Sequence, residues 1–68
     1  MSLTERQEQI LRCIREAIAE TGECPTLEEI GTKVGLTSKS AVHYQLKRLE
    51  ACGLIARAGQ GARIYRLA

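Results

Sequence analysis

The strongest constraint on the fold is a three-residue link, Gly35-Leu36-Thr37, between two segments that the sequence marks as helices. The segment before the link opens with Thr26-Leu27-Glu28-Glu29, a capping box in which the Thr and Glu side chains satisfy free backbone N–H groups. The segment after it opens at Thr37 or Ser38, both good N-cap residues. Because the link is short and its glycine stops the first helix, the two helices are predicted to cross steeply, as in a helix-turn-helix.

A longer helix is predicted before this pair. It opens with a second capping box, Thr4-Glu5-Arg6-Gln7, and Thr21-Gly22 supplies its stop. Between these signals the apolar residues follow helical spacing along one stripe: Ile10, Leu11, Ile14, Ala17 and Ile18. The opposite face is expected to be solvated.

The helix after the link is predicted over about 39–52, and its two faces differ. Val42, Leu46 and Leu49 form a core stripe, and Gly53 ends the helix. A rotation of 100° per residue from Val42 gives the residues of the far side: Ser40, Tyr44, Lys47 and Ala51, flanked by His43 and Arg48. Glu50 lies nearer the core side, so the outer face offers hydrogen-bonding groups and positive charge but no acid.

The last part of the chain changes to a strand-like pattern. Two runs, 54–58 and 62–67, flank Gly59-Gln60-Gly61 and predict a β-hairpin. The strand register stays open because Leu54 and Ile55 are both apolar. The predicted fold class is therefore mainly α with a small β-hairpin, a three-helix winged helix-turn-helix that forms a single domain over residues 1–68.

Size and composition limit the classes of function. A chain of 68 residues buries only about 60% of its unfolded surface, so an enclosed active site, and hence an enzyme, is not expected. The single histidine, His43, has no predicted pocket or nucleophile to work with. No cofactor and no small-molecule substrate are expected. With only two aromatic residues, Tyr44 and Tyr65, the core is predicted to be aliphatic.

The three cysteines indicate a reducing compartment. Their odd number and the lack of a C-x-x-C pair argue against a disulfide framework and against a metal site. Cys13 and Cys52 are expected to be semi-buried packing residues, whereas Cys24 lies in a turn beside Pro25 and is expected to be exposed. The first twenty residues hold no unbroken apolar stretch, so no signal peptide or membrane span is expected, and the protein is predicted to be soluble and cytoplasmic.

The charge is distributed unevenly along the chain. Residues 1–34 hold four basic and seven acidic side chains, a net charge of −3, whereas residues 35–68 hold six basic side chains and one acidic, a net charge of +5. A positive half on a small domain indicates a polyanionic partner, and the alternative is a solvated surface with uneven charge. The order of the predicted elements, together with the acid-free outer face, favours double-stranded DNA as that partner.

Short motifs run in order along nearly the whole chain: Leu3-Thr4-x-Arg6-Gln7, Ile14-Arg15, Pro25-Thr26-x-x-Glu29-Ile30, Val34-Gly35-Leu36-x-Ser38, Leu46-x-x-Leu49 and Gly53-Leu54-Ile55. In this order and spacing they resemble the N-terminal DNA-binding domain of LexA-type SOS repressors. The resemblance implies that the third helix enters the major groove and that its early side chains read bases. The matching positions are Ser40, Ala41, His43 and Tyr44.

The chain also departs from that family. The family usually carries polar or acidic residues at these helix positions, so with His43 and Tyr44 the family's operator sequence does not carry over to this chain. The family's second domain, with its Ser-Lys dyad and self-cleavage site, has no counterpart in these residues. Self-cleavage and the SOS response to DNA damage are therefore not expected of this chain, and neither is the family's usual dimer surface.

The resulting hypothesis is sequence-specific binding of double-stranded DNA by a transcriptional regulator that represses by occlusion. The candidate DNA-binding residues are Ser38, Lys39, Ser40, Ala41, His43, Tyr44, Lys47, Arg48, Arg57 and Arg63. His43 and Tyr44 are read alternatively as ordinary exposed helix residues, and Arg57 and Arg63 as cations that protect strand edges. A second hypothesis is a winged helix that contacts a protein within a larger assembly. For the DNA-binding hypothesis we expect a monomer in solution, with any pairing of two copies arising only on DNA.

Overall fold

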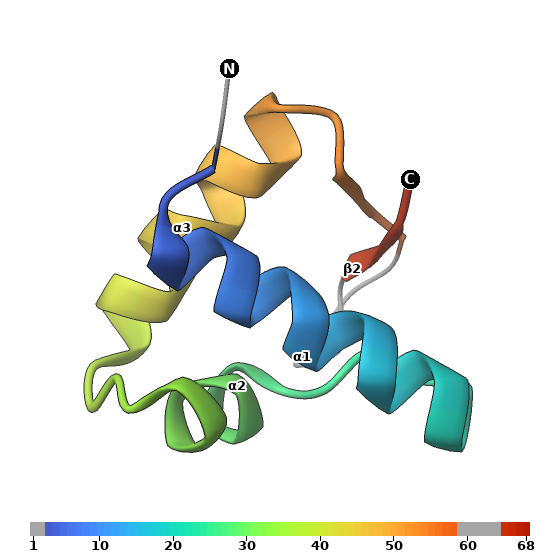
Figure 1. Cartoon of the computed structure of the whole chain (residues 1–68), viewed down its shortest axis with the longest axis horizontal. Helices are drawn as coiled ribbons and strands as arrows, with labels where there is room; N and C mark the ends of the chain where they lie inside the picture. The colour runs from blue at the N-terminus through green and yellow to red at the C-terminus, as the bar shows by residue number, and fades with distance from the viewer. Residues whose placement is uncertain (1–2, 59–64) are drawn as a thin grey trace.

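The computed structural model describes residues 3–58 and 65–68 of the chain. Three helices are followed by two short strands (Figure 1). Their bounds are α1 (Glu5–Thr21), α2 (Leu27–Val34), α3 (Lys39–Ala51), β1 (Ile55–Arg57) and β2 (Tyr65–Leu67). This is a mainly α winged helix-turn-helix, so the predicted fold class is confirmed. Within the two described ranges, no helix combines the length and the apolar character needed to cross a membrane.

Both predicted capping boxes are formed. At the start of α1 the Thr4 hydroxyl accepts a hydrogen bond from the Gln7 N–H, and the Gln7 side-chain oxygen accepts one from the Thr4 N–H, each at 3.2 Å. At the start of α2 the Thr26 hydroxyl accepts from the Glu29 N–H at 3.1 Å, and the Glu29 carboxylate accepts from the Thr26 N–H at 2.8 Å. These reciprocal bonds satisfy backbone donors that a helix start leaves free.

The turn between α2 and α3 follows from the way α2 ends. Gly35 has a φ of 79°, in the left-handed region that glycine adopts without steric cost. The N–H groups of Gly35 and Leu36 both donate to the carbonyl oxygen of Gly31, the latter at 2.9 Å, which closes the helix end. Ser38 then caps α3, with its hydroxyl accepting from the Ala41 N–H at 3.4 Å. Four residues, 35–38, therefore separate the two helices.

The end of α3 directs the chain into the wing. The helix stops at Ala51, one residue earlier than predicted, and Gly53 takes the left-handed conformation as expected. The Leu54 N–H donates to the Leu49 carbonyl at 3.2 Å, and the Gly53 N–H donates to the Glu50 carbonyl at 2.9 Å. This pair of bonds closes the helix and turns the backbone toward β1.

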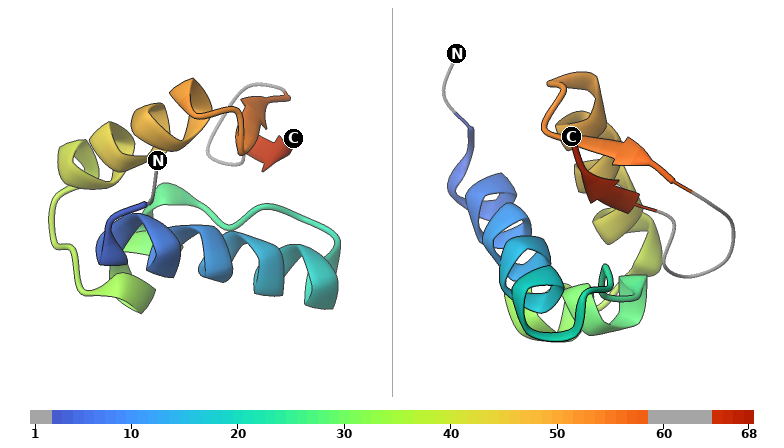
Figure 2. Two further views of the ribbon diagram at one scale, coloured as in Figure 1. Left: turned by 45° about the horizontal axis from the view of Figure 1, so that its top comes forward. Right: turned by 90° about the vertical axis from the view of Figure 1, so that its right-hand side faces the viewer.

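The two strands pair antiparallel beside α3 (Figure 2, right). Ile55 lies opposite Leu67, and Arg57 lies opposite Tyr65, which answers the register question that the sequence left open. Ile55 and Tyr65 are buried while Arg57 is exposed, so each of the two pairs places one side chain in the core. β1 is shorter than the predicted run 54–58, and residues 59–64, which include the start of the second predicted run, lie outside the described residues.

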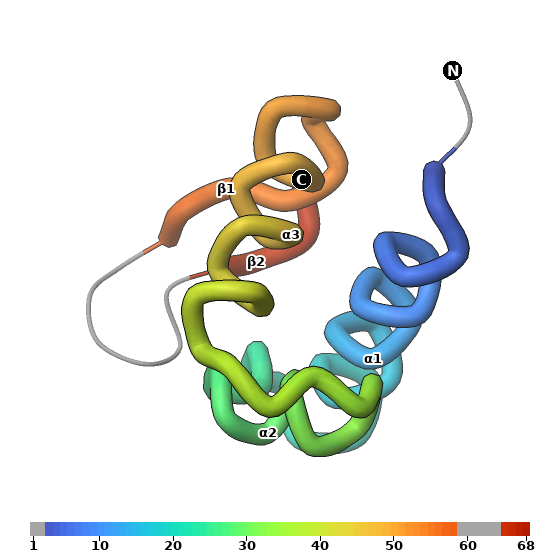
Figure 3. Tube along the Cα trace, turned by 90° about the vertical axis from the view of Figure 1, so that its left-hand side faces the viewer, coloured from blue at the N-terminus to red at the C-terminus, as the bar shows by residue number. Residues whose placement is uncertain are grey.

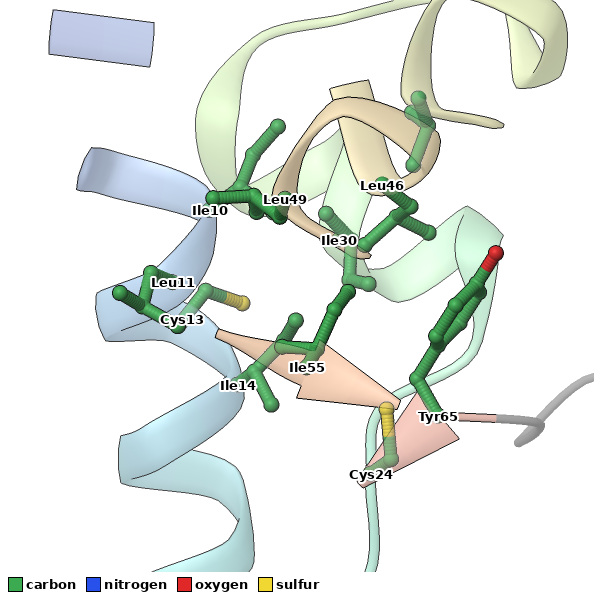
Figure 4. Close-up of a cluster of buried hydrophobic side chains, with 11 residues drawn as sticks. Ile10, Leu11, Cys13, Ile14, Cys24, Ile30, Leu46, Leu49, Ile55 and Tyr65 are labelled. Atoms are coloured by element: carbon green, nitrogen blue, oxygen red, sulfur yellow. The ribbon is translucent and has the colours of Figure 1, made fainter. Parts of the chain in front are cut away.

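The core lies where the three helices and the hairpin meet (Figure 4). Its largest fully buried side chains are aliphatic: Ile10, Ile14, Ile30, Val42, Leu46, Leu49 and Ile55. The prediction of a purely aliphatic core is nevertheless wrong, because Tyr65 is only 3% exposed and packs within the same cluster. The register of β2 turns this residue inward, and the pattern of the sequence did not show that register.

Two of the three cysteines do not lie where the sequence placed them. Cys24 is buried, at 7% exposure, because the loop before α2 brings it into the core cluster, where it lies near Tyr65 (Figure 4). Cys52 is exposed, because it is the C-cap residue of α3 and lies beyond the packed turns of that helix. Cys13 is buried on α1, in keeping with its predicted packing role.

Candidate nucleic-acid interface

The helix α3 lies along one edge of the molecule and presents two opposite faces (Figure 2, left). Its inner face carries Val42, Leu46 and Leu49, which are at most 1% exposed. On its outer face Ser40 and Lys47 are exposed, and Tyr44 is 60% exposed, the one large apolar side chain in the described residues that faces solvent to this degree. The two faces predicted from helical periodicity are therefore confirmed.

The outer face of α3 is positively charged. Lys39, Lys47 and Arg48 are all exposed, and the first turn of the helix carries no acidic residue. The one acid of α3, Glu50, is half-buried on the core side. An exposed helix surface that combines cations with hydroxyl groups and lacks carboxylates suits a polyanion.

The start of α3 adds neutral hydrogen-bonding groups to this surface. Ser38 and Ser40 are exposed, and their hydroxyl oxygens lie 3.0 Å apart, so one donates to the other. Ala41 and His43 are half-buried at the sides of the helix. A helix N-terminus also carries a partial positive charge, which favours a phosphate there.

The wing contributes a more distant part of the candidate site. Arg57 is exposed at the end of β1, which packs against α3 (Figure 3). Arg63, the other predicted wing contact, lies outside the described residues. The structure thus brings together eight of the predicted site residues, 38–41, 43, 44, 47 and 48, at one helix and its cap, with Arg57 on the neighbouring strand.

In the described ranges, no group of three or more His, Cys, Asp or Glu side chains is placed so that it could hold a metal ion. Burial raises the pKa of the Cys13 thiol above its usual value of 9.0, and Lys33 only partly opposes this effect. Cys13 therefore stays protonated and unreactive at neutral pH.

Two residues that contact the end of α2 and the turn before α3 were not identified from the sequence. Arg6 appeared only as part of a capping motif, yet its guanidinium donates a hydrogen bond to the carbonyl oxygen of Val34 at the end of α2. Gly31, inside α2, lies against the carbonyl of Leu36 with no space for a side chain. Neither contact leaves a local pattern, because the first joins residues 28 positions apart and the second depends on the path of the turn.

Residues 1–64 match the family model described as the LexA DNA binding domain. The chain belongs to the LexA DNA-binding domain family. The resemblance read from the motifs is thereby confirmed. Among similar proteins, the LexA repressor of Mycobacteroides abscessus is 52% identical over 56 residues, which cover 82% of this chain and 25% of that repressor. The LexA repressor of Sorangium cellulosum is 44% identical over 64 residues, which cover 94% of this chain and 28% of that repressor.

The chain thus spans about a quarter of the length of the LexA repressors that it matches. The similarity to the LexA family lies in the winged helix-turn-helix described above, including all of α1, α2, α3 and β1. The helix α3, which carries the candidate interface, lies within the matched residues.

Proposed function

We propose that the protein binds double-stranded DNA in a sequence-specific manner and acts as a transcriptional repressor. The observation that carries this proposal is the exposed, acid-free outer face of α3, where Ser40 and Tyr44 lie among Lys39, Lys47 and Arg48. Membership of the LexA DNA-binding domain family supports the same conclusion. In this proposal α3 lies in the major groove, which admits one α-helix.

The residues divide into two roles by their chemistry. Side chains near the start of α3 read base edges: Ser40, Ala41, His43 and Tyr44. A hydroxyl or a ring nitrogen exchanges hydrogen bonds with bases, whereas the methyl group of Ala41 and the ring of Tyr44 pack against a thymine methyl. Phosphate contacts come from the cap and the cations: Ser38, Lys39, Lys47 and Arg48.

The wing supplies the remaining contacts. Arg57 and Arg63 flank the hairpin turn in the sequence and reach the phosphate backbone or the minor groove. These two residues add affinity with little base discrimination, because a phosphate carries no sequence information and the minor groove carries only a degenerate pattern. Repression follows by occlusion when the bound protein covers a promoter, as the name of the similar LexA repressors suggests.

Selection of bound duplexes from a random pool tests this function. The wild-type protein should enrich a short common sequence, and the enriched duplex then serves as the probe for titration. Lys47→Ala should lower the affinity and reduce the dependence of log affinity on log salt by about one. Lys33→Ala is the matched control, because it removes an exposed lysine from α2 without touching the proposed interface.

Two outcomes would overturn the proposal. A pool that yields no common sequence would show that α3 does not read bases, and this is the result expected of a module that contacts protein instead. Equal losses of affinity for Lys47→Ala and Lys33→Ala would show that binding follows net charge and not the outer face of α3.

A further inference from the structure

Arg6 connects two helices that are far apart in the sequence. It lies in the first turn of α1, and its guanidinium Nη1 donates to the carbonyl oxygen of Val34, the last residue of α2. A Cβ placed on Gly35 would lie 3.9 Å from the same nitrogen, so the guanidinium covers the point where α2 turns toward α3. Arg6 is half-buried, in contrast to Arg12 and Arg15 on the same helix, which are exposed.

The Val34 carbonyl is a group that needs an external donor. The last four carbonyls of a helix have no partner within the helix. The N–H groups of Gly35 and Leu36 both donate to Gly31, so they do not satisfy Val34. A cation at a helix C-terminus is also favoured by the helix dipole. Arg6 supplies both the donor and the charge.

The position of this contact matters because only residues 35–38 join α2 to α3. On one side the turn lies against α2, where the missing side chain of Gly31 lets the Leu36 carbonyl approach. On the other side Arg6 ties the beginning of the turn to α1. Ser40 and Tyr44 follow within the first two turns of α3, so a shift of this short turn would change where both side chains point.

We infer that Arg6 is a positioning residue, which holds the turn between α2 and α3 in place and thereby sets how α3 meets the bases. This inference rests on the proposed function. It assigns to Arg6 an effect on sequence discrimination without a contact to DNA, since its guanidinium is directed to a protein carbonyl.

Three variants measured at a temperature well below their unfolding midpoints test the inference. Arg6→Ala removes both the hydrogen-bond donor and the charge. Arg6→Lys keeps the charge and replaces the planar guanidinium with a compact ammonium group. Arg15→Ala is the control for the loss of an exposed arginine from α1. For each variant, titrations use the duplex enriched from a random pool and a scrambled duplex of the same composition, over a range of salt concentrations.

Arg6→Ala should reduce the ratio of the two affinities by about three- to tenfold, the range expected for a residue that acts through a neighbour. Its salt dependence should equal that of the wild type, because no phosphate contact is lost. Arg6→Lys should restore part of the discrimination, and Arg15→Ala should match the wild type. If Arg6→Ala fails to fold, Arg6→Lys carries the test and should show a smaller loss at unchanged salt dependence.

Amide hydrogen exchange of the free protein gives a readout that does not depend on DNA. Arg6→Ala should speed exchange at Leu36 and neighbouring turn residues while exchange at Ile10 and Ile14 stays as in Arg15→Ala. Unchanged discrimination in Arg6→Ala would overturn the inference, and so would a salt dependence lowered by about one, which would mean that Arg6 contacts a phosphate. A wild-type protein that binds no duplex would overturn the proposed function, whereas unchanged exchange at Leu36 would overturn the inference alone.

Discussion

Gly31 lies so close to Leu36 that a Cβ at its position would be 2.8 Å from the Leu36 carbonyl oxygen. This separation is below the contact distance that real side chains allow, and the atom it meets belongs to the backbone. The turn between α2 and α3 therefore cannot take its observed path over any other residue at this position. The Cγ2 atom of Val42 on α3 would lie 3.4 Å from the same Cβ position.

Gly31→Ala should destabilise the protein even though alanine is the better helix former. The gain in helix propensity is about 1 kcal/mol. Displacing the packed backbone costs about 2–3 kcal/mol, the upper part of the range for overpacking, so we expect a net loss of about 1–2 kcal/mol. Urea unfolding measures this change, with Thr32→Ala on the exposed side of α2 as the control, which should stay within about 0.5 kcal/mol. A Gly31→Ala protein as stable as the wild type would contradict the close approach.

Tyr65→Phe should leave the free energy of unfolding unchanged or raise it. The Tyr65 hydroxyl is buried and has no hydrogen-bond partner in the described part of the structure. An unsatisfied buried polar group costs about 1–3 kcal/mol, and phenylalanine keeps the ring that fills the core. Thermal and urea unfolding of the two proteins should give at least equal stability for the variant. A clear loss of stability would instead show that the hydroxyl is satisfied.

The protein should lose stability as the pH rises above about 9, and Cys13 should account for part of the loss. Burial raises the pKa of this thiol above its ordinary value of 9.0. The unfolded chain then releases the proton at a lower pH than the folded chain, so the folded state is favoured below pH 9.0 and loses this advantage as the pH rises toward the folded pKa.

Cys13→Ala isolates this effect. The cavity it leaves lowers stability at every pH, so the measured quantity is the slope of the unfolding free energy against pH, not its value. We expect a shallower slope in the variant between pH 9 and pH 10, and the titration of Tyr65, whose usual pKa is 10.0, contributes equally to both proteins. Parallel curves for the two proteins would show that Cys13 does not contribute.

Substitutions on α3 and on the wing should separate specificity from affinity. Ser40→Ala and Tyr44→Ala should relax the base preference at particular positions of the enriched duplex, by about 1–3 kcal/mol where a good contact is lost. Arg57→Ala should weaken binding to all duplexes by a similar factor, because neither a phosphate contact nor a minor-groove contact distinguishes the bases well. Titrations against single-base variants of the duplex make the comparison. The assigned roles would be reversed if Arg57→Ala altered base preference and the α3 variants did not.

Much of the fold could be predicted because its signals are local. A capping box such as Thr4 with Gln7 and a helix stop such as Gly35 act over four residues or fewer, so the sequence shows them directly. The outer face of α3 follows from helical periodicity alone, once Val42 is placed in the core. Most of the candidate site lies on this face, so it could be predicted from the same periodicity.

The remaining features depend on contacts between distant parts of the chain. The burial of Cys24 and Tyr65 follows from the meeting of the loop before α2 with the hairpin, and the register of the hairpin was ambiguous because Leu54 and Ile55 are both apolar. The bond from Arg6 to Val34 likewise joins two helices whose relative position no local pattern specifies. Such contacts become visible only when the elements are packed together.

The most direct measurement of the central claim is the affinity of the wild-type protein for duplex DNA as a function of salt concentration. The proposed phosphate contacts come from five cations: Lys39, Lys47, Arg48, Arg57 and Arg63. About four or five such contacts predict that log affinity falls with log salt at a slope near −4. A random duplex and the enriched duplex should both show this steep dependence, with the enriched duplex bound more tightly at each salt concentration. A flat salt response, or equal affinities for the two duplexes, would contradict sequence-specific DNA binding by this chain.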